Sequence, residues 1–284
     1  MTTLKSPIGA HVPVAGGLAT GGLKYAAEIG AETVQVFTSN PRGWALPEGK
    51  PEEDARLLER SGEIPVFVHA PYLVNFGTPS AETLEKSLAT VRHSLRRGRA
   101  IGARGVVVHT GSAVSQSYDA AMKQVREHVL PLLEEIPEDG PDLLLEPMAG
   151  QGAMLCAKVL DLGEYFDRLE RHPKLGVCLD TCHAFAAGHD LAAPDGVERT
   201  IADLVATVGP GRLKLVHAND SKDVCGSCKD RHENIGKGHI GEEPFAALLR
   251  HPEVAGVPFV IETPGRDAEP HRADVNVLKR LRDA

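Results

Sequence analysis

Short runs of apolar residues recur along the chain, and each is followed by turn residues and then by a stretch with helical periodicity. Several runs are apolar throughout, such as the three valines at 106–108 and the three leucines at 143–145. Such runs are typical of parallel strands that are buried on both faces. The pattern predicts strands at residues 8–12, 33–37, 66–69, 105–109, 143–146, 176–180, 213–217 and 259–262. Helices are expected between them, including residues 81–101, 118–136 and 154–171.

Eight alternations of strand and helix favour a closed barrel over an open sheet. A chain of 284 residues has the length of a single α/β barrel. No Pro- or Ser-rich linker divides it, and no short repeat is visible. We therefore expect an α/β fold, a (β/α)8 TIM barrel, with one domain over residues 1–284.

The composition is that of an ordinary soluble protein, with 42% hydrophobic and 25% charged residues. No stretch approaches the roughly 20 apolar residues that a membrane span needs, and the first seven residues lack the apolar core of a secretion signal. Five cysteines in a chain of this length suggest a reducing compartment rather than a disulfide framework. We expect a cytoplasmic protein with no membrane partner, and nothing calls for more than a monomer.

The formal net charge of −8 argues against a nucleic-acid-binding protein, because such proteins usually carry a basic face. The objection is weaker if part of the acidic excess consists of metal ligands.

Polar residues collect at the predicted strand ends. Strands three to eight end on, or are closely followed by, His69, His109, Glu146, Asp180 with His183, His217 and Glu262. The carboxyl ends of neighbouring barrel strands converge on one cavity, so these side chains are expected to meet. Taken singly, each could be a hydrogen-bonded core residue or half of an ion pair. Six consecutive strand ends of this kind favour a metal site instead.

Metal ions would offset the cost of burying so many carboxylates and imidazoles. The mixture of ligands suits zinc, with manganese or iron as the next choices. Asp230 and His232 form a further pair two residues apart, which in an extended chain project to the same side, while Arg231 points away toward a phosphate or a surface ion pair. The nine candidate ligands are enough for two or three ions.

Several segments together resemble endonuclease IV, the zinc-dependent abasic-site endonuclease family, over essentially the whole chain. The segments are IGAHV at 8–12 with GGL at 16–18, HAPYL at 69–73, Glu146 followed by AGQG at 149–152, LDTCHAFAAG at 179–188, DRH at 230–232 and GKGHIG at 236–241. The combination is far more specific than any one segment.

The resemblance implies a trinuclear zinc centre, with Mn²⁺ as a possible occupant of some sites. His69 and His109 would hold one ion, which Glu146 would bridge to a second. Asp180, His217 and Glu262 would complete the second, and the third would be held by His183, Asp230 and His232. Three Zn²⁺ would offset six of the eight formal negative charges and make the pocket positive.

The resemblance also implies double-stranded DNA with abasic sites as the partner. A wedge of Arg42, Tyr72 and Leu73 would distort the DNA, and an aromatic ring is suited to fill the gap left by a missing base. Without the resemblance, ordinary loop packing would be the preferred interpretation of Tyr72 and Leu73. Further candidate DNA contacts are Gln151, Lys222, Arg231 and Lys237.

The implied reaction is hydrolysis of the phosphodiester on the 5′ side of an abasic site, with 3′-hydroxyl and 5′-deoxyribose phosphate products. A metal-bridging hydroxide would attack phosphorus, and Glu146 and Glu262 would be catalytic residues that position it.

The main alternative is a sugar isomerase or epimerase of the xylose isomerase-like barrels, which would not need all nine ligands. A non-enzymatic metal-stabilised or nucleic-acid-binding protein is the second alternative.

Two features lie outside the family pattern. Cys225 and Cys228 form a C-x-x-C without a second pair, which favours a plain loop or an occasional disulfide over a zinc site. His11 faces the predicted mouth and is expected to touch substrate or orient a ligand.

Overall fold

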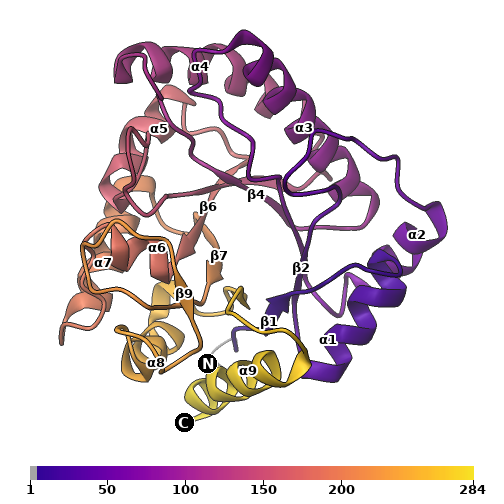
Figure 1. Cartoon of the computed structure of the whole chain (residues 1–284), viewed down its shortest axis with the longest axis vertical. Helices are drawn as coiled ribbons and strands as arrows, with labels where there is room; N and C mark the ends of the chain where they lie inside the picture. The colour runs from indigo at the N-terminus through magenta and orange to yellow at the C-terminus, as the bar shows by residue number, and fades with distance from the viewer. Residues whose placement is uncertain (1–4) are drawn as a thin grey trace.

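The computed structural model describes residues 5–284, and within them parallel strands close into a barrel in the order β1-β10-β7-β6-β5-β4-β3-β2. Figure 1 shows the helices lying around the outside of this barrel. The strands are β1 (Ile8–His11), β2 (Val34–Val36), β3 (Val66–His69), β4 (Gly105–His109), β5 (Asp142–Glu146), β6 (Leu175–Asp180), β7 (Leu213–His217) and β10 (Phe259–Ile261). Each lies within two residues of an expected strand, and the predicted TIM barrel is confirmed.

The helices between the strands are α1 (Lys24–Ile29), α2 (Pro51–Arg60), α3 (Ala81–Ala100), α4 (Tyr118–Glu134), α5 (Leu162–Arg168), α6 (Thr181–Ala186), α7 (Gly196–Val208), α8 (Glu242–Arg250) and α9 (Ala268–Asp283). Shorter helical turns are η1 (Leu18–Leu23), η2 (Val159–Asp161) and η3 (Pro252–Val254), and β8 (Asp220–Ser221) pairs with β9 (His232–Glu233) as a small hairpin. Along residues 5–284, no helix is both long and apolar enough to cross a membrane.

Two of the expected helices begin where serines cap them, since Ser80 and Ser117 accept hydrogen bonds from the first turns of α3 and α4. The helix expected over 154–171 is wrong at its start. Met154 instead forms a bridge with Ser112, and the Asp161 carboxylate accepts from the backbone N–H groups of 157 and 158. This local hydrogen bonding keeps the segment irregular until η2, and α5 begins only at Leu162.

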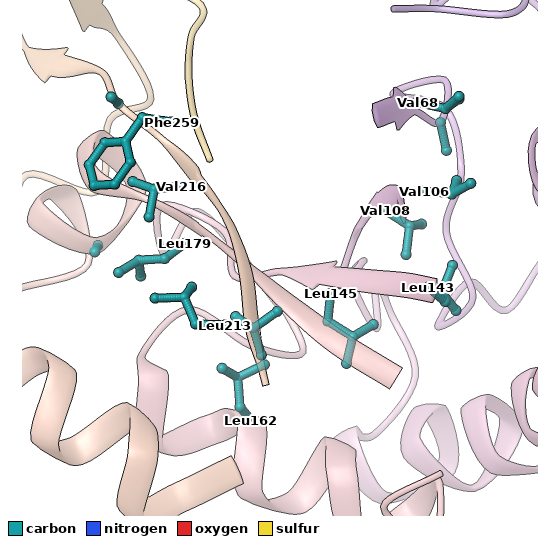
Figure 2. Packing of buried hydrophobic residues seen from close by; sticks show 14 of the residues in the cluster. Val68, Val106, Val108, Leu143, Leu145, Leu162, Leu179, Leu213, Val216 and Phe259 are labelled. Atoms are coloured by element: carbon teal, nitrogen blue, oxygen red, sulfur yellow. The ribbon is translucent and has the colours of Figure 1, made fainter. Parts of the chain in front are cut away.

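The strands carry two layers of apolar side chains, one on each face. One layer faces the helices, and Figure 2 shows strand side chains such as Leu145 and Leu213 together with Leu162 of α5. The other layer is a separate buried cluster inside the barrel, made of Phe67, Val107, Leu144, Cys178, Leu215 and Val260. Because side chains alternate along a strand, the residue two positions after each of these also points into the barrel.

A buried ion pair joins two helices of the outer layer, and its loss is expected to be costly. Asp54 on α2 accepts hydrogen bonds from both terminal nitrogens of Arg97 on α3, one at 2.6 Å, and both residues are buried. Replacing Asp54 by Ala leaves an unpaired buried guanidinium, so we expect a loss of about 3–5 kcal/mol in the free energy of unfolding. Urea unfolding measures this loss.

The matched control involves the same helix. Arg99 of α3 pairs with Asp139 on the surface, at 2.9 Å. Asp139→Ala is expected to leave the urea midpoint unchanged within error, because exposed pairs contribute little. Equal losses in the two variants would contradict the role assigned to burial.

Candidate metal centre

Six strands place a ligand-type side chain two residues beyond the inner apolar layer, at the carboxyl end of the barrel. These side chains are His69, His109, Glu146, Asp180, His217 and Glu262, in the order of the strands β3, β4, β5, β6, β7 and β10. The strand register brings His109 opposite Glu146 and Asp180 opposite His217. On each of these strands, the apolar side chain inside the barrel and the candidate ligand two residues later therefore lie on the same face.

The first group of candidate ligands consists of His69, His109 and Glu146. The Nε2 atoms of the two histidines lie 3.2 and 3.5 Å from Oε2 of Glu146, and His69 and Glu146 are buried. His69 Nδ1 lies 2.7 Å from the Ala70 carbonyl oxygen and donates its proton there. The remaining nitrogen, Nε2, then faces the carboxylate, and a metal-ligating histidine is oriented in the same way by a hydrogen bond from its other nitrogen.

The second group surrounds His217. Its Nδ1 atom lies 3.0 Å from Glu146 Oε1, 3.4 Å from Glu262 Oε2 and 3.9 Å from Asp180 Oδ2. One atom from each of these four residues lies within 4.8 Å of every other. Glu146 thus contributes one oxygen to the first group and the other to the second.

The third group combines a helix start with the small hairpin. Asp230 lies 3.2 Å from His183 Nε2 through one oxygen and 3.1 Å from His232 Nε2 through the other. His183 donates through Nδ1 to the Pro147 carbonyl oxygen, and His232 through Nδ1 to that of Glu262. Both Nε2 atoms therefore face carboxylate oxygens, as in the first group.

The chemistry of these side chains suits the binding of divalent cations. His232 Nε2 is buried and forms no hydrogen bond among the described residues, although Asp230 Oδ1 is only 3.1 Å away. At this distance the carboxylate calls for positive charge beside it, which either a proton on Nε2 or a bound cation supplies. Imidazoles and carboxylates are the ligands that zinc prefers, so the residues present fit this group of ions.

The charges of the cluster lead to the same conclusion. Burial alone would lower the pKa of His183, but the carboxylates of Asp180, Asp230 and Glu146 raise it to about 10. Burial is likewise outweighed by Asp180 and Asp230 at His232, whose pKa is raised to about 9. The carboxylates therefore favour the protonated, positively charged form of both histidines. A bound cation would supply the same positive charge.

The two glutamates show the reverse effect. Burial would raise the pKa of the Glu262 carboxyl, but His217 and His11 outweigh it and hold that pKa well below its usual value. The pKa of Glu146 is also lowered, because His217 outweighs the effect of burial. Both groups are carboxylates at neutral pH and are suited to coordinate a cation.

The residues expected to distort DNA lie on adjacent loops at the mouth of the barrel. Tyr72 is 47% exposed, and its ring stacks on His109 with centroids 5.7 Å apart. Leu73 is also exposed. The Tyr72 N–H donates to the Pro41 carbonyl oxygen at 3.0 Å, which brings the loop of the exposed Arg42 beside it. The three residues thus share one rim of the candidate site.

The other predicted DNA contacts are exposed, but two of them lie close to acidic side chains. Gln151, Lys222 and Lys237 are on the surface, with Lys222 3.9 Å from Glu233. Arg231 is exposed, and Asp223 holds its guanidinium through two contacts of 2.6 Å. Its role toward a phosphate stays a prediction. Cys225 and Cys228 are free thiols in the loop before Asp230.

Some buried residues that support the site were not found by the sequence reasoning. Gln35 and Asn219 are fully buried, and each hydrogen-bonds to candidate ligands. His11, which was expected near the mouth, lies with Nδ1 3.1 Å from Glu262 Oε1. An amide between two valines, as at Gln35, is the signal that could have been used, because a polar residue in the middle of a buried strand needs partners.

One buried carboxylate shapes the loop that carries Lys237. Asp220 accepts hydrogen bonds of 2.8–3.3 Å from the backbone N–H groups of Ser221, Gly236, Gly238, Ile240 and Gly241. A Cβ atom at Gly238 would lie 2.3 Å from the Ser221 carbonyl oxygen and 2.5 Å from Asp220. The loop is therefore closely packed, with the side chains of Lys237 and His239 reaching its surface.

Comparisons with known proteins agree with this geometry. A family model described as xylose isomerase-like TIM barrel matches residues 23–281. A protein of Streptomyces coelicolor named probable endonuclease 4 is 62% identical, over 98% of this chain and 96% of its own. The crystal structure of endonuclease IV from Thermus thermophilus superposes with a TM-score of 0.83 at 31% identity, covering 98% of this chain and 99% of that one.

A D-tagatose 3-epimerase-like protein superposes with a TM-score of 0.73 but is only 19% identical, over 98% of both chains. This likeness to a sugar enzyme shows a shared fold alone. The predicted resemblance is confirmed by the relatives of higher identity: the chain belongs to the xylose isomerase-like TIM barrel family and, within it, to the endonuclease IV enzymes, which are hydrolytic nucleases.

Proposed function

We propose that this chain repairs double-stranded DNA by hydrolysing the phosphodiester on the 5′ side of abasic sites, leaving a 3′-hydroxyl and a 5′-deoxyribose phosphate. The observation that carries the proposal is the meeting of nine histidine, aspartate and glutamate side chains in three groups at the barrel mouth, beside an exposed aromatic rim. Names of the relatives, endonuclease 4 and endonuclease IV, support the same class of reaction.

We propose further that the three groups hold three Zn²⁺ ions, with Mn²⁺ as an alternative in some of them. The proposed ligands are His69, His109 and Glu146 for one ion, Glu146, Asp180, His217 and Glu262 for another, and His183, Asp230 and His232 for the last. Bound metal of this kind polarises phosphate oxygens and makes water acidic enough to act as a nucleophile near neutral pH.

The residues of the chain itself would orient the reacting groups. Glu262 and Glu146 are catalytic residues in this proposal, since Glu146 belongs to both the first and the second group and Glu262 Oε2 lies 3.4 Å from His217 Nδ1 in the second. Charge favours the reaction in a second way. Three divalent ions against four ligand carboxylates leave the mouth positive, so a phosphate meets a positive pocket although the chain is acidic.

The exposed rim would recognise the lesion. Arg42, Tyr72 and Leu73 stand on neighbouring loops, and their side chains would enter the gap left by the missing base. Gln151, Lys222, Arg231 and Lys237 are proposed contacts to the DNA on either side.

Replacing Tyr72 by Ala is expected to weaken binding to an abasic duplex by about tenfold. An aromatic side chain stacked on a base contributes about 1–3 kcal/mol, and in intact DNA the gap that the ring would fill does not exist. Affinity for intact duplex should therefore change much less. Fluorescence anisotropy with matched abasic and intact duplexes measures both affinities.

Tyr72→Phe is the control, because it keeps the ring and should bind the abasic duplex almost as the native chain does. Equal losses of affinity for both duplexes in Tyr72→Ala would remove Tyr72 from lesion recognition.

All groups proposed for the reaction come from one chain, which supports an active monomer. The free thiols of all five cysteines support a cytoplasmic location.

A further inference from the structure

Gln35 lies in the middle of β2, between Val34 and Val36, and has no exposed surface. Its amide contacts the second candidate metal group at both ends. Oε1 lies 2.8 Å from His217 Nε2, and Nε2 lies 2.7 Å from Glu262 Oε1. One side chain that is not itself a ligand thus contacts two of the four proposed ligands of that ion.

The contacts fix the direction of both hydrogen bonds. A carboxylate oxygen only accepts, so the end of the Gln35 amide at Glu262 must be the NH₂ group. The oxygen of the amide is then directed at His217, and it must accept a proton from Nε2. His217 therefore carries a hydrogen on Nε2, and its Nδ1 atom faces Glu146, Asp180 and Glu262.

The same amide selects the oxygen with which Glu262 meets the ion. Oε1 is occupied by Gln35 and by the neighbouring His11, whose Nδ1 is 3.1 Å away. Oε2 is left 3.4 Å from His217 Nδ1, inside the ligand group. Burying an amide is costly unless its hydrogen bonds are made, and both ends of this amide find partners among the proposed ligands.

We propose that Gln35 is a positioning residue for the metal centre. It holds the His217 ring with Nδ1 directed at the ion and holds Glu262 so that Oε2 points inward. The inference rests on the proposed function, in which these groups bind Zn²⁺. Hydrogen-bond partners of metal ligands typically contribute about 10–100-fold to metal affinity.

The test measures zinc retention rather than activity alone. Native chain, Gln35→Met and Gln35→Glu are loaded with zinc and titrated with a chelator that changes colour on binding the metal. Gln35→Met removes both hydrogen bonds at nearly constant volume. Gln35→Glu keeps an acceptor for His217 but replaces the donor to Glu262 by a second negative charge.

One ion per chain is expected to leave both variants at about 10–100-fold lower chelator concentration than in the native chain, while the remaining ions are kept. Turnover of an abasic duplex should fall in kcat, with little change in KM, because the DNA-contacting rim is untouched. Gln35→Glu keeps the shape of the native side chain, and it carries the test if Gln35→Met does not fold.

Thr33→Val is the matched control. Thr33 lies two residues earlier in the chain, is fully buried, and donates to the Pro65 carbonyl oxygen at 2.8 Å. Its loss is expected to lower the urea midpoint without changing zinc retention. A general weakening of the barrel would instead release zinc from all three variants alike, and that result would overturn the inference.

The inference and the proposed function fail in different ways. If the native chain holds zinc and cuts abasic DNA, and both Gln35 variants keep every ion as tightly, only the role of Gln35 is wrong. If the native chain binds no zinc and leaves abasic DNA uncut, both are overturned.

Discussion

Protein stripped of divalent metal is expected to lose at least about a thousandfold of its strand scission at abasic sites and to regain it when Zn²⁺ is added. The chain supplies histidines and carboxylates at the reaction point, with Nε2 of His69 and His232 facing carboxylate oxygens. A catalytic metal is worth several kcal/mol of transition-state stabilisation, and each tenfold in rate corresponds to about 1.4 kcal/mol. Nicking of a labelled abasic duplex, before and after chelator treatment, measures the loss.

Metal content and folding are followed in the same samples. Chain purified without chelator is expected to contain about three zinc ions, because the nine proposed ligands make up three groups, and the further group of Asp180, Cys182 and His232 shares two of its three residues with them. Circular dichroism of the stripped protein separates loss of metal from loss of the fold. A content of one ion or none, or full scission in the stripped and folded protein, would contradict the proposed centre.

Glu262→Gln is expected to reduce scission by about a thousandfold while leaving affinity for abasic duplex close to that of the native chain. The substitution keeps the shape of the side chain but removes a carboxylate whose Oε2 lies 3.4 Å from His217 Nδ1. It therefore weakens the electrostatic part of catalysis, whose loss commonly costs about 10²–10³ in turnover. The proposed DNA contacts lie on other loops and are left in place.

Single-turnover cleavage and anisotropy binding give the two quantities separately, and the zinc content of the variant shows whether an ion has been lost with the charge. Glu243→Gln, at the exposed start of α8, is the control and should cut abasic DNA like the native chain. Scission by Glu262→Gln at the native rate would exclude Glu262 from catalysis.

The barrel could be predicted because its signal is repetitive. Strands buried on both faces are apolar at consecutive positions, as at Val106–Val108, and the helices between them carry their own period. The start of α5 could not be predicted in this way. Apolar spacing over 154–171 resembles a helix, whereas the Asp161 side chain and the bridge of Met154 hold the first residues in another conformation.

The candidate ligands were predictable for a related reason. His69 follows Phe67 by two residues, and Glu146 follows Leu144 by two, so the alternation that buries the core also directs the ligands. The period of two also placed Asp230 and His232 on one side of their segment.

What the sequence did not reveal depends on contacts between distant segments. Gln35 is 182 residues from His217 and 227 from Glu262, and no local pattern connects them. Arg231 was expected to point away from the cluster, but its engagement by Asp223 depends on how the loop between β8 and β9 turns back. Periodicity indicates on which face of a strand a side chain lies, but it does not indicate which distant residue a flexible side chain contacts.

The carboxylate of Asp220 has a consequence for how this enzyme could diversify. Its hydrogen bonds use the backbone of the loop at 236–241, whose glycines 236 and 241 adopt φ of 78° and 80° and whose Gly238 has no room for a side chain. Hydrogen bonds donated by backbone N–H groups do not depend on which side chains the loop carries. Residues 237 and 239 can therefore differ without changing the course of the loop, so the DNA contact proposed for Lys237 can be altered on a fixed frame.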